Sequence, residues 1–580
     1  MEMNIEKVNS MPLNENKFSK NEKNFDSKKK IIYPISIFVI CFLIIGIAFT
    51  LVKEKLGNKS HYQAQNIGNY ISKELIICET GLDDKCLACN DETNECLSCN
   101  PLFELVNGKC VPNYSFKAVY LTEEENEKID LIYKSMLYFI LEMSIDNTNS
   151  SIQSYYVFPT PGVHTVYFKL DESKLTSIGS MFNYVKKLTS IYFNPKFYGS
   201  NLIDMQALFY ECNSLTSVDL TNFNTENVQS MANMFYNCYS LNKINISNFD
   251  TRKVKNMFRM FYGCRSLESI DLSSFETRKL NEMGMMFYGS GITNIDISNF
   301  NTENIRSFSD LFNGCKNLTS IKISNIKTYN INNMDNMFKG CSSLISLDLS
   351  CFDTSSLTSM HEMFSGCSKL TSINLSSFKT DKVTKLINTF KDCSKLITLD
   401  ISNFDTSRVS MMEGMFSGCE NLFYLNIGGF NTSKVYTMKN MFYKCSTLTS
   451  LDISKFNTSK VSTMEGMFHG CSNLKSLDLS NFNTPVLNSI ANMFRGCSSL
   501  TSINLSSFSV GNHLYYREYV FYDCPNLIYI DISSFTSSIT YDKLFNENIG
   551  ANGAIKINKT ILNKIEKYVP NGWKLEIVEE

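Results

Sequence analysis

Histidine and tryptophan are scarce in this chain of 580 residues, which contains five histidines and one tryptophan. Histidine is the side chain most often used for acid–base catalysis near neutral pH, so its scarcity argues against an enzyme. The sequence also contains no glycine-rich phosphate loop, no His-x-x-x-His pair and no Gly-x-Ser-x-Gly motif. We therefore predict a protein that is not an enzyme, with no cofactor and no metal site.

A strong charge of one sign is missing as well. The net charge is −2 and the isoelectric point is near 6.3. Proteins that bind nucleic acid usually carry a basic patch or stripe, because each phosphate contact needs a positive partner. We therefore predict no nucleic-acid partner. Hydrophobic residues make up 43% of the chain, which is enough to build a large core.

One long apolar run lies near the start, "IIYPISIFVICFLIIGIAFTLV" at 31–52, and it contains no charged residue. Its 22 residues would span a hydrocarbon core of about 30 Å as a helix. Lys28, Lys29 and Lys30 precede it, so the positive-inside rule places 1–30 in the cytoplasm as a disordered tail and the remainder outside. A cleaved signal peptide is the alternative, but 30 polar residues before the run favour an uncleaved anchor. We predict a single-pass cell-membrane protein.

Eighteen of the twenty cysteines fall into two groups, and the first lies in a predicted stalk at 53–112. In the cytosol its spacing would indicate zinc, whereas outside the cell it indicates three disulfides. The predicted topology favours disulfides, whose pairing the sequence leaves open. The candidates are Cys78, Cys86, Cys89, Cys96, Cys99 and Cys110.

A 26-residue pattern then repeats, and fourteen copies can be counted from Leu188 to Leu527. Within one copy, Leu448, Leu451 and Ile453 follow the pattern of a half-buried strand. Positions 461, 464, 467, 468 and 471 are apolar at three- and four-residue intervals, which predicts a short helix. Thr458 fits the N-cap of that helix and Gly470 its left-handed end. One such unit cannot bury its apolar face alone, so the copies should stack as a solenoid.

The motif "GCSNLKSLDLSNFNTPVLNSIANMF", at 470–494, resembles the repeat of the BspA-like leucine-rich-repeat surface proteins. The resemblance implies an α/β repeat solenoid of about 14–15 repeats at 163–535, with a parallel β-sheet on one face and short helices on the other. It also implies binding in adhesion to host matrix, host cells or other microbes. The Asn/Lys/Ile-rich composition and the stalk indicate a protist member of the family.

Both ends of the solenoid need caps. Residues 113–162 contain "EENEKIDLIYKSMLYFILEM", an amphipathic helix pattern that predicts an N-terminal cap. Residues 163–170, "VHTVYFKL", resemble a degenerate repeat. The pattern of 553–580 predicts a strand, a helix and a strand within a C-terminal cap at 536–580, with Trp573 packed against the last repeat.

The second cysteine group recurs once per repeat, as runs of three and nine separated by Ser290. Disulfides between neighbouring repeats are conceivable, but both runs are odd, so each would leave one thiol over. Pairing would also pull alternate repeats together. We predict buried free thiols, with Cys351, which lies off this column, the most readily alkylated.

An acidic column follows the strands, because the residue between two inward positions must face away from the core. It can be a solvated face of hydrogen-bonding side chains, or a docking strip for basic protein segments or divalent cations. The candidate binding residues are Asp219, Asp271, Asp296, Asp348, Asp400, Asp452, Asp478 and Asp531.

The sequence therefore predicts a membrane-anchored surface protein whose extracellular solenoid binds protein or glycan ligands, most directly in adhesion. A passive coat protein and a recognition receptor that signals through a partner are the alternatives. If the repeats lie outside the cell, Asn58 and Asn149 are the glycosylation sites we expect to be used.

Overall fold

The computed structural model describes residues 86–89, 96–99, 102–107, 109–197, 199–509, 513–536, 541–545 and 548–579. The chain divides into two compact units, Met1–Cys96 and Leu97–Glu580. The first four strands are short: β1 Cys86–Cys89, β2 Cys96–Cys99, β3 Phe103–Val106 and β4 Lys109–Pro112. The antiparallel β3–β4 hairpin leads into the remainder of the second unit.

The N-terminal cap is a β-structure, and the helix predicted within 124–143 is wrong. That segment forms β6 (Glu127–Asp130), the 3-10 helix η1 (Lys134–Phe139) and β7 (Ile140–Ile145). Its alternating apolar residues enter the core from extended backbone: Ile129, Leu131 and Met143 are buried. The apolar residues of this segment therefore follow the two-residue period of a strand and not the period of an α-helix.

The remaining cap strands are β5 (Phe116–Thr122), β8 (Thr148–Ser150), β9 (Tyr155–Phe158) and β10 (Gly162–Leu170), followed by the 3-10 helix η2 (Glu172–Lys174). β10 lies antiparallel between β5 and β7, so "VHTVYFKL" is part of the cap and not a degenerate repeat. β5 also pairs antiparallel with β11 (Leu188–Phe193), the first strand of the solenoid. The cap thus covers the open edge of the first repeat with paired backbone.

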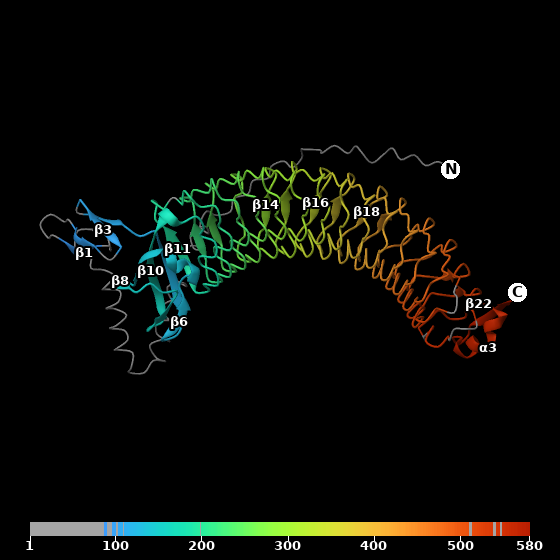
Figure 1. Ribbon diagram of the computed structural model, residues 1–580. Helices are drawn as coiled ribbons and strands as arrows, with labels where there is room; N and C mark the ends of the chain where they lie inside the picture. Colours follow the sequence, from blue (N-terminus) through green and yellow to red (C-terminus); the bar gives the residue numbers. More distant parts are fainter. Residues whose placement is uncertain are drawn as a thin grey trace, which may run out of the picture. The chain divides into compact units, whose positions relative to one another are not determined.

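From β11 onward the chain forms a leucine-rich-repeat-like β-solenoid of about fourteen turns, with very little helix. Its turns follow one another side by side from green to orange in Figure 1. Neighbouring strands are parallel and in register, as in Ser346 beside Ser372. The strands are β12 Ser217–Asp219, β13 Lys243–Asn245, β14 Asn294–Asp296, β15 Ser320–Lys322, β16 Ser346–Asp348, β17 Ser372–Asn374, β18 Thr398–Asp400, β19 Tyr424–Asn426, β20 Ser502–Asn504 and β21 Tyr529–Asp531.

The helix predicted in each repeat is also wrong, because two β-turns take its place. Met467 N–H donates to the carbonyl of Met464 three residues earlier, whereas Phe468 N–H donates to Met493 in the next turn of the solenoid at 2.9 Å. Gly466 and Gly470 have φ of 60° and 77°, the left-handed conformation that closes each β-turn. The predicted left-handed residue is present, but it ends a β-turn and not a helix.

The threonine predicted as a helix N-cap has a different role, because there is no helix to cap. Thr406 Oγ1 donates to the carbonyl of Asn431 in the next turn at 2.9 Å and accepts the N–H of the same residue at 2.8 Å. The donated bond recurs from Thr225 to Thr458, whereas the hydroxyl of Thr484, the last threonine of the column, has no partner among the described residues. The threonines are buried, and a hydroxyl that links two turns accounts for this residue type at every position but the last.

Columns of identical side chains fill the core. The phenylalanines at the position of Phe468 stack ring on ring, with centroids 5.6 Å apart for Phe442–Phe468 and 5.7 Å for Phe468–Phe494. Phe456 and Met464 are buried beside them, which confirms both as core residues. Each turn completes the core of its neighbour.

The C-terminal end adds two longer parallel strands, β22 (Ala554–Asn558) and β23 (Lys574–Val578). Between them lie η3 (Lys559–Ile561), the one-turn helix α3 (Leu562–Ile565) and η4 (Glu566–Tyr568). Trp573 is buried, and its Nε1 donates to the carbonyl of Gly550.

The predicted localisation requires a correction. Among the residues that the structure describes, no helix is long and apolar enough to cross a membrane. This finding contradicts the prediction of a single-pass membrane protein with extracellular repeats, which we do not carry further. The predicted span at 31–52 and the tail before it lie outside the described residues.

Candidate binding face

The strands present one open face, which is built from three outward columns. In β16, Leu347 points into the core, while Ser346 and Asp348 are exposed on the opposite side. The residue before the strand, Ile345, is exposed as well. We call the column of Asp348 the carboxylate column, that of Ser346 the strand column and that of Ile345 the corner column. The corner column runs through Thr293, Thr319, Ile345, Thr371, Ile397, Phe423, Thr449, Lys475, Thr501 and Ile528.

The carboxylates of this face make a local bond that supports the fold. Asp400 Oδ1 accepts the N–H of Ser402 at 3.0 Å and the Ser402 hydroxyl at 2.7 Å. Asn374 makes the equivalent bond to the N–H of Ser376 at 3.2 Å. The side chain thus satisfies a backbone donor where the strand turns away, and aspartate and asparagine serve equally.

These hydrogen bonds also stabilise the charged form of the aspartates. The Ser402 N–H and hydroxyl hold the pKa of Asp400 below its usual value, and Ser350 does the same for Asp348. The hydroxyl and N–H of Ser454 likewise lower the pKa of Asp452. Asp348, Asp400 and Asp452 are therefore ionised at neutral pH.

Not every predicted carboxylate lies free on the open face. Asp296 lies 3.5 Å from the Nζ of Lys322 in the next turn. Asp531 is only 3% exposed and lies 3.4 Å from the Nζ of Lys556, so its prediction as an exposed residue is wrong. The remaining members of the predicted set are exposed.

Apolar side chains on the same face were missed from the sequence. Ile345, Ile397, Phe423 and Tyr424 are 55%, 50%, 61% and 51% exposed. Each replaces the threonine or serine found at its column position in other turns. Departure from the repeat consensus was therefore the signal that could have found them.

A second row of aromatic residues lies after the stacked phenylalanines, on the turns. Tyr210, Tyr236, Tyr262 and Tyr288 stack with centroids 4.4, 4.6 and 4.5 Å apart along the row. Burial and the neighbouring tyrosines raise the pKa of Tyr210 and that of Tyr262 to about 12. We call these four residues the tyrosine stack; they are half-buried against one another.

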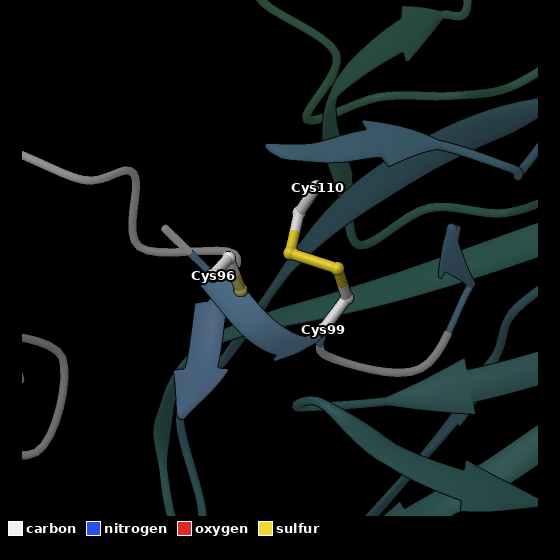
Figure 2. Close-up of side chains that lie close together, drawn as sticks. All are labelled: Cys96, Cys99 and Cys110. Atoms are coloured by element: carbon white, nitrogen blue, oxygen red, sulfur yellow. A yellow bond between two sulfur atoms is a disulfide. The ribbon is translucent and has the colours of Figure 1, made fainter. Parts of the chain in front are cut away.

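Two of the predicted stalk cysteines form a disulfide. Cys99 and Cys110 are joined at an S–S distance of 2.05 Å, and Figure 2 shows the bond with Cys96 also labelled. Cys96 is disulfide-bonded too. A disulfide sulfur offers no thiolate, so these three side chains are not zinc ligands. Cys78 and the side chains of Cys86 and Cys89 lie outside what the structure describes.

The cysteine column of the solenoid is reduced, as predicted. All twelve of its cysteines are free and buried. Cys471 Sγ donates to the carbonyl of Phe442 in the preceding turn at 3.1 Å, and its burial raises the thiol pKa to about 12. Such thiols stay protonated and unreactive.

Cys351 lies off the column and is exposed. We expect iodoacetamide to label it first in the native chain, which peptide mass spectrometry would show. Labelling of the column before Cys351 would contradict this.

One polar cluster in the N-terminal cap has the residue types of a catalytic triad. His164 Nδ1 lies 2.8 Å from Asp146 Oδ2, and its Nε2 lies 3.2 Å from Thr122 Oγ1 and 3.0 Å from the carbonyl of Thr160. His164 and Thr122 are both buried. A hydroxyl closed off from solvent cannot attack a substrate. We therefore assign the cluster a structural role, in which His164 of β10 is hydrogen-bonded to Thr122 of β5 and to Asp146.

The predicted glycosylation sites stay predictions. Asn149 is exposed on β8, whereas Asn58 lies outside the described residues.

Parallel three-residue strands, inward leucines and consecutive β-turns define the class as a leucine-rich-repeat-like β-solenoid. The chain belongs to the family described as Mycoplasma protein of unknown function, DUF285, whose model matches residues 165–268, 203–321, 307–424 and 421–535. The comparison with curated proteins gives no match.

Two of the solved structures with a similar arrangement are bacterial. A leucine-rich cell surface protein of Faecalibacterium prausnitzii is 18% identical with a TM-score of 0.32, over 57% of this chain and 82% of that chain. A leucine-rich-repeat protein of Eubacterium ventriosum is 17% identical with a TM-score of 0.26, over 66% of this chain and 82% of that chain.

Proposed function

We propose that the solenoid is a non-enzymatic module that binds macromolecules, protein or glycan, through its open face, and that this binding serves adhesion to host matrix, host cells or other microbes. The supporting observation is a division between constant and variable positions. The inward columns repeat phenylalanine, methionine and cysteine, whereas the exposed corner column changes between threonine, isoleucine, phenylalanine and lysine. A rigid scaffold with variable outward side chains is suited to recognition.

The narrower assignments belong to the same proposal. The BspA-like repeat pattern at 470–494 supports attachment as the purpose of binding, and composition supports a protist member of that group. The carboxylate column, in which Asp219, Asp271, Asp348, Asp400, Asp452 and Asp478 are exposed, is proposed as part of the binding face.

Binding of the full-length chain to arrays of matrix proteins and glycans tests the proposal. We expect saturable binding to at least one protein or glycan, with a Kd in the micromolar range or below. Absence of binding to every surface would contradict it and favour a passive structural protein. A variant with Asp400, Asp452 and Asp478 changed to Asn keeps the local hydrogen bonds that Asn374 makes, so it separates charge from folding.

A further inference from the structure

An exposed apolar strip interrupts the polar open face, and we define it as Ile345, Ile397, Phe423 and Tyr424. All four side chains are at least half exposed. Single exposed apolar residues are common on protein surfaces, but several in one place indicate an interaction site. The strip is therefore the part of this face where we expect a binding partner to cover exposed apolar surface.

Backbone hydrogen bonds place the corner residues of neighbouring turns side by side, with Thr371 between Ile345 and Ile397. Phe423 N–H donates to the carbonyl of Ile397 at 2.9 Å, and Thr371 N–H donates to the carbonyl of Ile345 at 2.8 Å. Successive corner residues thus lie one strand spacing apart, about 4.8 Å. Three spacings separate Ile345 from Phe423, so the strip is about 15 Å long. Tyr424, in the strand column, widens it toward the carboxylates.

The charges beside the strip are arranged by sign. Asp348 and Asp400 lie in turns of the strip, and Asp452 and Asp478 lie in the two turns after it. All four are exposed on the strand side, and none forms an ion pair with a lysine or arginine in the part of the chain that the structure describes. On the other side of the corner column lie the exposed Lys369 and Lys395. Asp296 and Asp531, which do have lysine partners, lie in other turns. Two carboxylates without a cationic partner, Asp348 and Asp400, therefore flank the apolar strip, and Asp452 and Asp478 continue their column beyond it.

We infer that this strip docks a basic amphipathic protein segment, with apolar side chains against Ile345, Ile397 and Phe423 and with lysines or arginines facing the carboxylate column. This inference rests on the proposed function and names its partner class. Exposed isoleucines favour apolar protein side chains over glycan hydroxyls, and the carboxylates repel nucleic acid. A second copy bound with its two-fold axis across the strip would oppose like charges, whereas an axis along the strip would set carboxylates against Lys369 and Lys395; self-association of the free chain through this face would therefore overturn the inference.

Synthetic peptides provide a direct probe for the full-length chain. One peptide has about 14 residues with leucines at three- and four-residue intervals and lysines elsewhere; as a helix it spans roughly 21 Å. The control peptides carry glutamate for each lysine, or serine for each leucine. We expect the leucine–lysine peptide to bind at least about tenfold more tightly than either control. Equal binding of the glutamate peptide would overturn the inference.

A matched pair of variants tests the location. The strip variant combines Ile345→Thr, Ile397→Thr, Phe423→Thr and Tyr424→Ser, which restores residues that other turns carry at the same positions. The control is Tyr436→Ser, because Tyr436 is 40% exposed and its neighbours in the adjacent turns are Ser410 and Ser462. We expect the strip variant to weaken peptide binding at least about tenfold and the control to leave it within about twofold.

Charge variants test the orientation of the partner. Lys322 shows that the carboxylate column accepts a lysine, so Asp400→Lys should fold and should weaken peptide binding, whereas Lys395→Glu should not. Unchanged affinity in both the strip variant and Asp400→Lys, with unchanged thermal melting, would overturn the inference. If the strip variant still binds its array ligands fully, the inference fails while the proposed function stands. If the parent chain binds neither arrays nor peptides, both fail.

Discussion

Aromatic residues reach the surface of the solenoid on two sides, and they are held differently. In the tyrosine stack, Tyr236 lies 4.4 Å from Tyr210 and 4.6 Å from Tyr262, ring on ring. On the open face, Phe423 and Tyr424 are 61% and 51% exposed. The stacked tyrosines cover one another, whereas the open-face residues leave most of their area to solvent.

The difference in exposure between the tyrosine stack and the open-face residues indicates which aromatic side chains are available to bind a ligand. A row of stacked rings gains its stabilisation from its own neighbours and needs no ligand. An exposed ring that replaces a consensus threonine gains nothing comparable within the fold, so a partner is the more direct explanation. Removing a stacked ring should therefore lower stability, and removing an exposed one should lower binding.

The buried phenylalanine stack should show the largest stability effect. Phe390 lies between Phe364 and Phe416, with centroids 5.4 and 5.9 Å away. We expect Phe390→Ala to lower the free energy of unfolding by about 3–5 kcal/mol, because a large cavity replaces the ring. Denaturant unfolding measures this, with the exposed Phe423→Ala as the control that changes little. Equal losses in the two variants would show that burial does not separate the two kinds of ring.

The threonine links between turns should contribute next. Thr406→Val removes the hydroxyl that serves both the N–H and the carbonyl of Asn431 and leaves both groups without this partner. We expect a loss of about 1–3 kcal/mol by denaturant unfolding, with unchanged peptide binding. Thr406→Ser keeps the hydroxyl and is the control; if it costs as much as Thr406→Val, shape and not hydrogen bonding accounts for the column.

The tyrosine stack should have a smaller effect and a pH signature. Tyr236→Ser should cost about 1 kcal/mol and leave binding unchanged. Burial raises the pKa of Tyr210 and Tyr262 to about 12, so the associated stability is complete below pH 10 and is lost as the pH rises toward 12. Absorbance titration of tyrosinate should show this late class, shifted toward 10 in the variant. Titration of all tyrosines near pH 10 would contradict it.

Removing carboxylates should affect stability least. The triple change of Asp400, Asp452 and Asp478 to Asn preserves the acceptor for the serine N–H, as Asn374 shows. We expect an almost unchanged melting curve at neutral pH but weaker binding with less dependence on salt. The pKa values of Asp400, Asp452 and Asp478 are lowered in the folded chain, so the stability that their ionised forms add is lost as the pH falls through the folded pKa values. The triple variant should therefore lose less stability than the parent chain over the same pH range. Unaltered binding would place the site away from the carboxylate column.

The strand period of the repeat was predictable, and the helix was not. Leu451 and Ile453, two residues apart, predict a strand in each repeat, and the carboxylate column follows from the same alternation. Inward residues at 464, 467, 468 and 471 fit a helix, but two consecutive β-turns give the same spacing. Gly466 and Gly470 would be unfavourable inside a helix, so the signal against one was present.

The carboxylates of the candidate site were predictable from the sequence, whereas its apolar residues and the covering of Asp531 were not. Alternation identifies the face on which Asp348 and Asp400 lie, because it depends only on the chain. It does not show that Asp531 is covered by Lys556, since that contact comes from the C-terminal strands beyond the repeats. Ile345 and Phe423 looked like ordinary apolar residues until the structure placed them outside the core.

The most direct measurement of the central claim is a footprint of the complex. Hydroxyl-radical labelling of the full-length chain, with and without the array ligand or the leucine–lysine peptide, reports which side chains the ligand covers. We predict protection of Ile345, Ile397, Phe423 and Tyr424 and unchanged labelling of Tyr210 and Tyr236. Protection of the tyrosine stack, with the open face still labelled as in the free chain, would contradict the claim that the open face is the binding face.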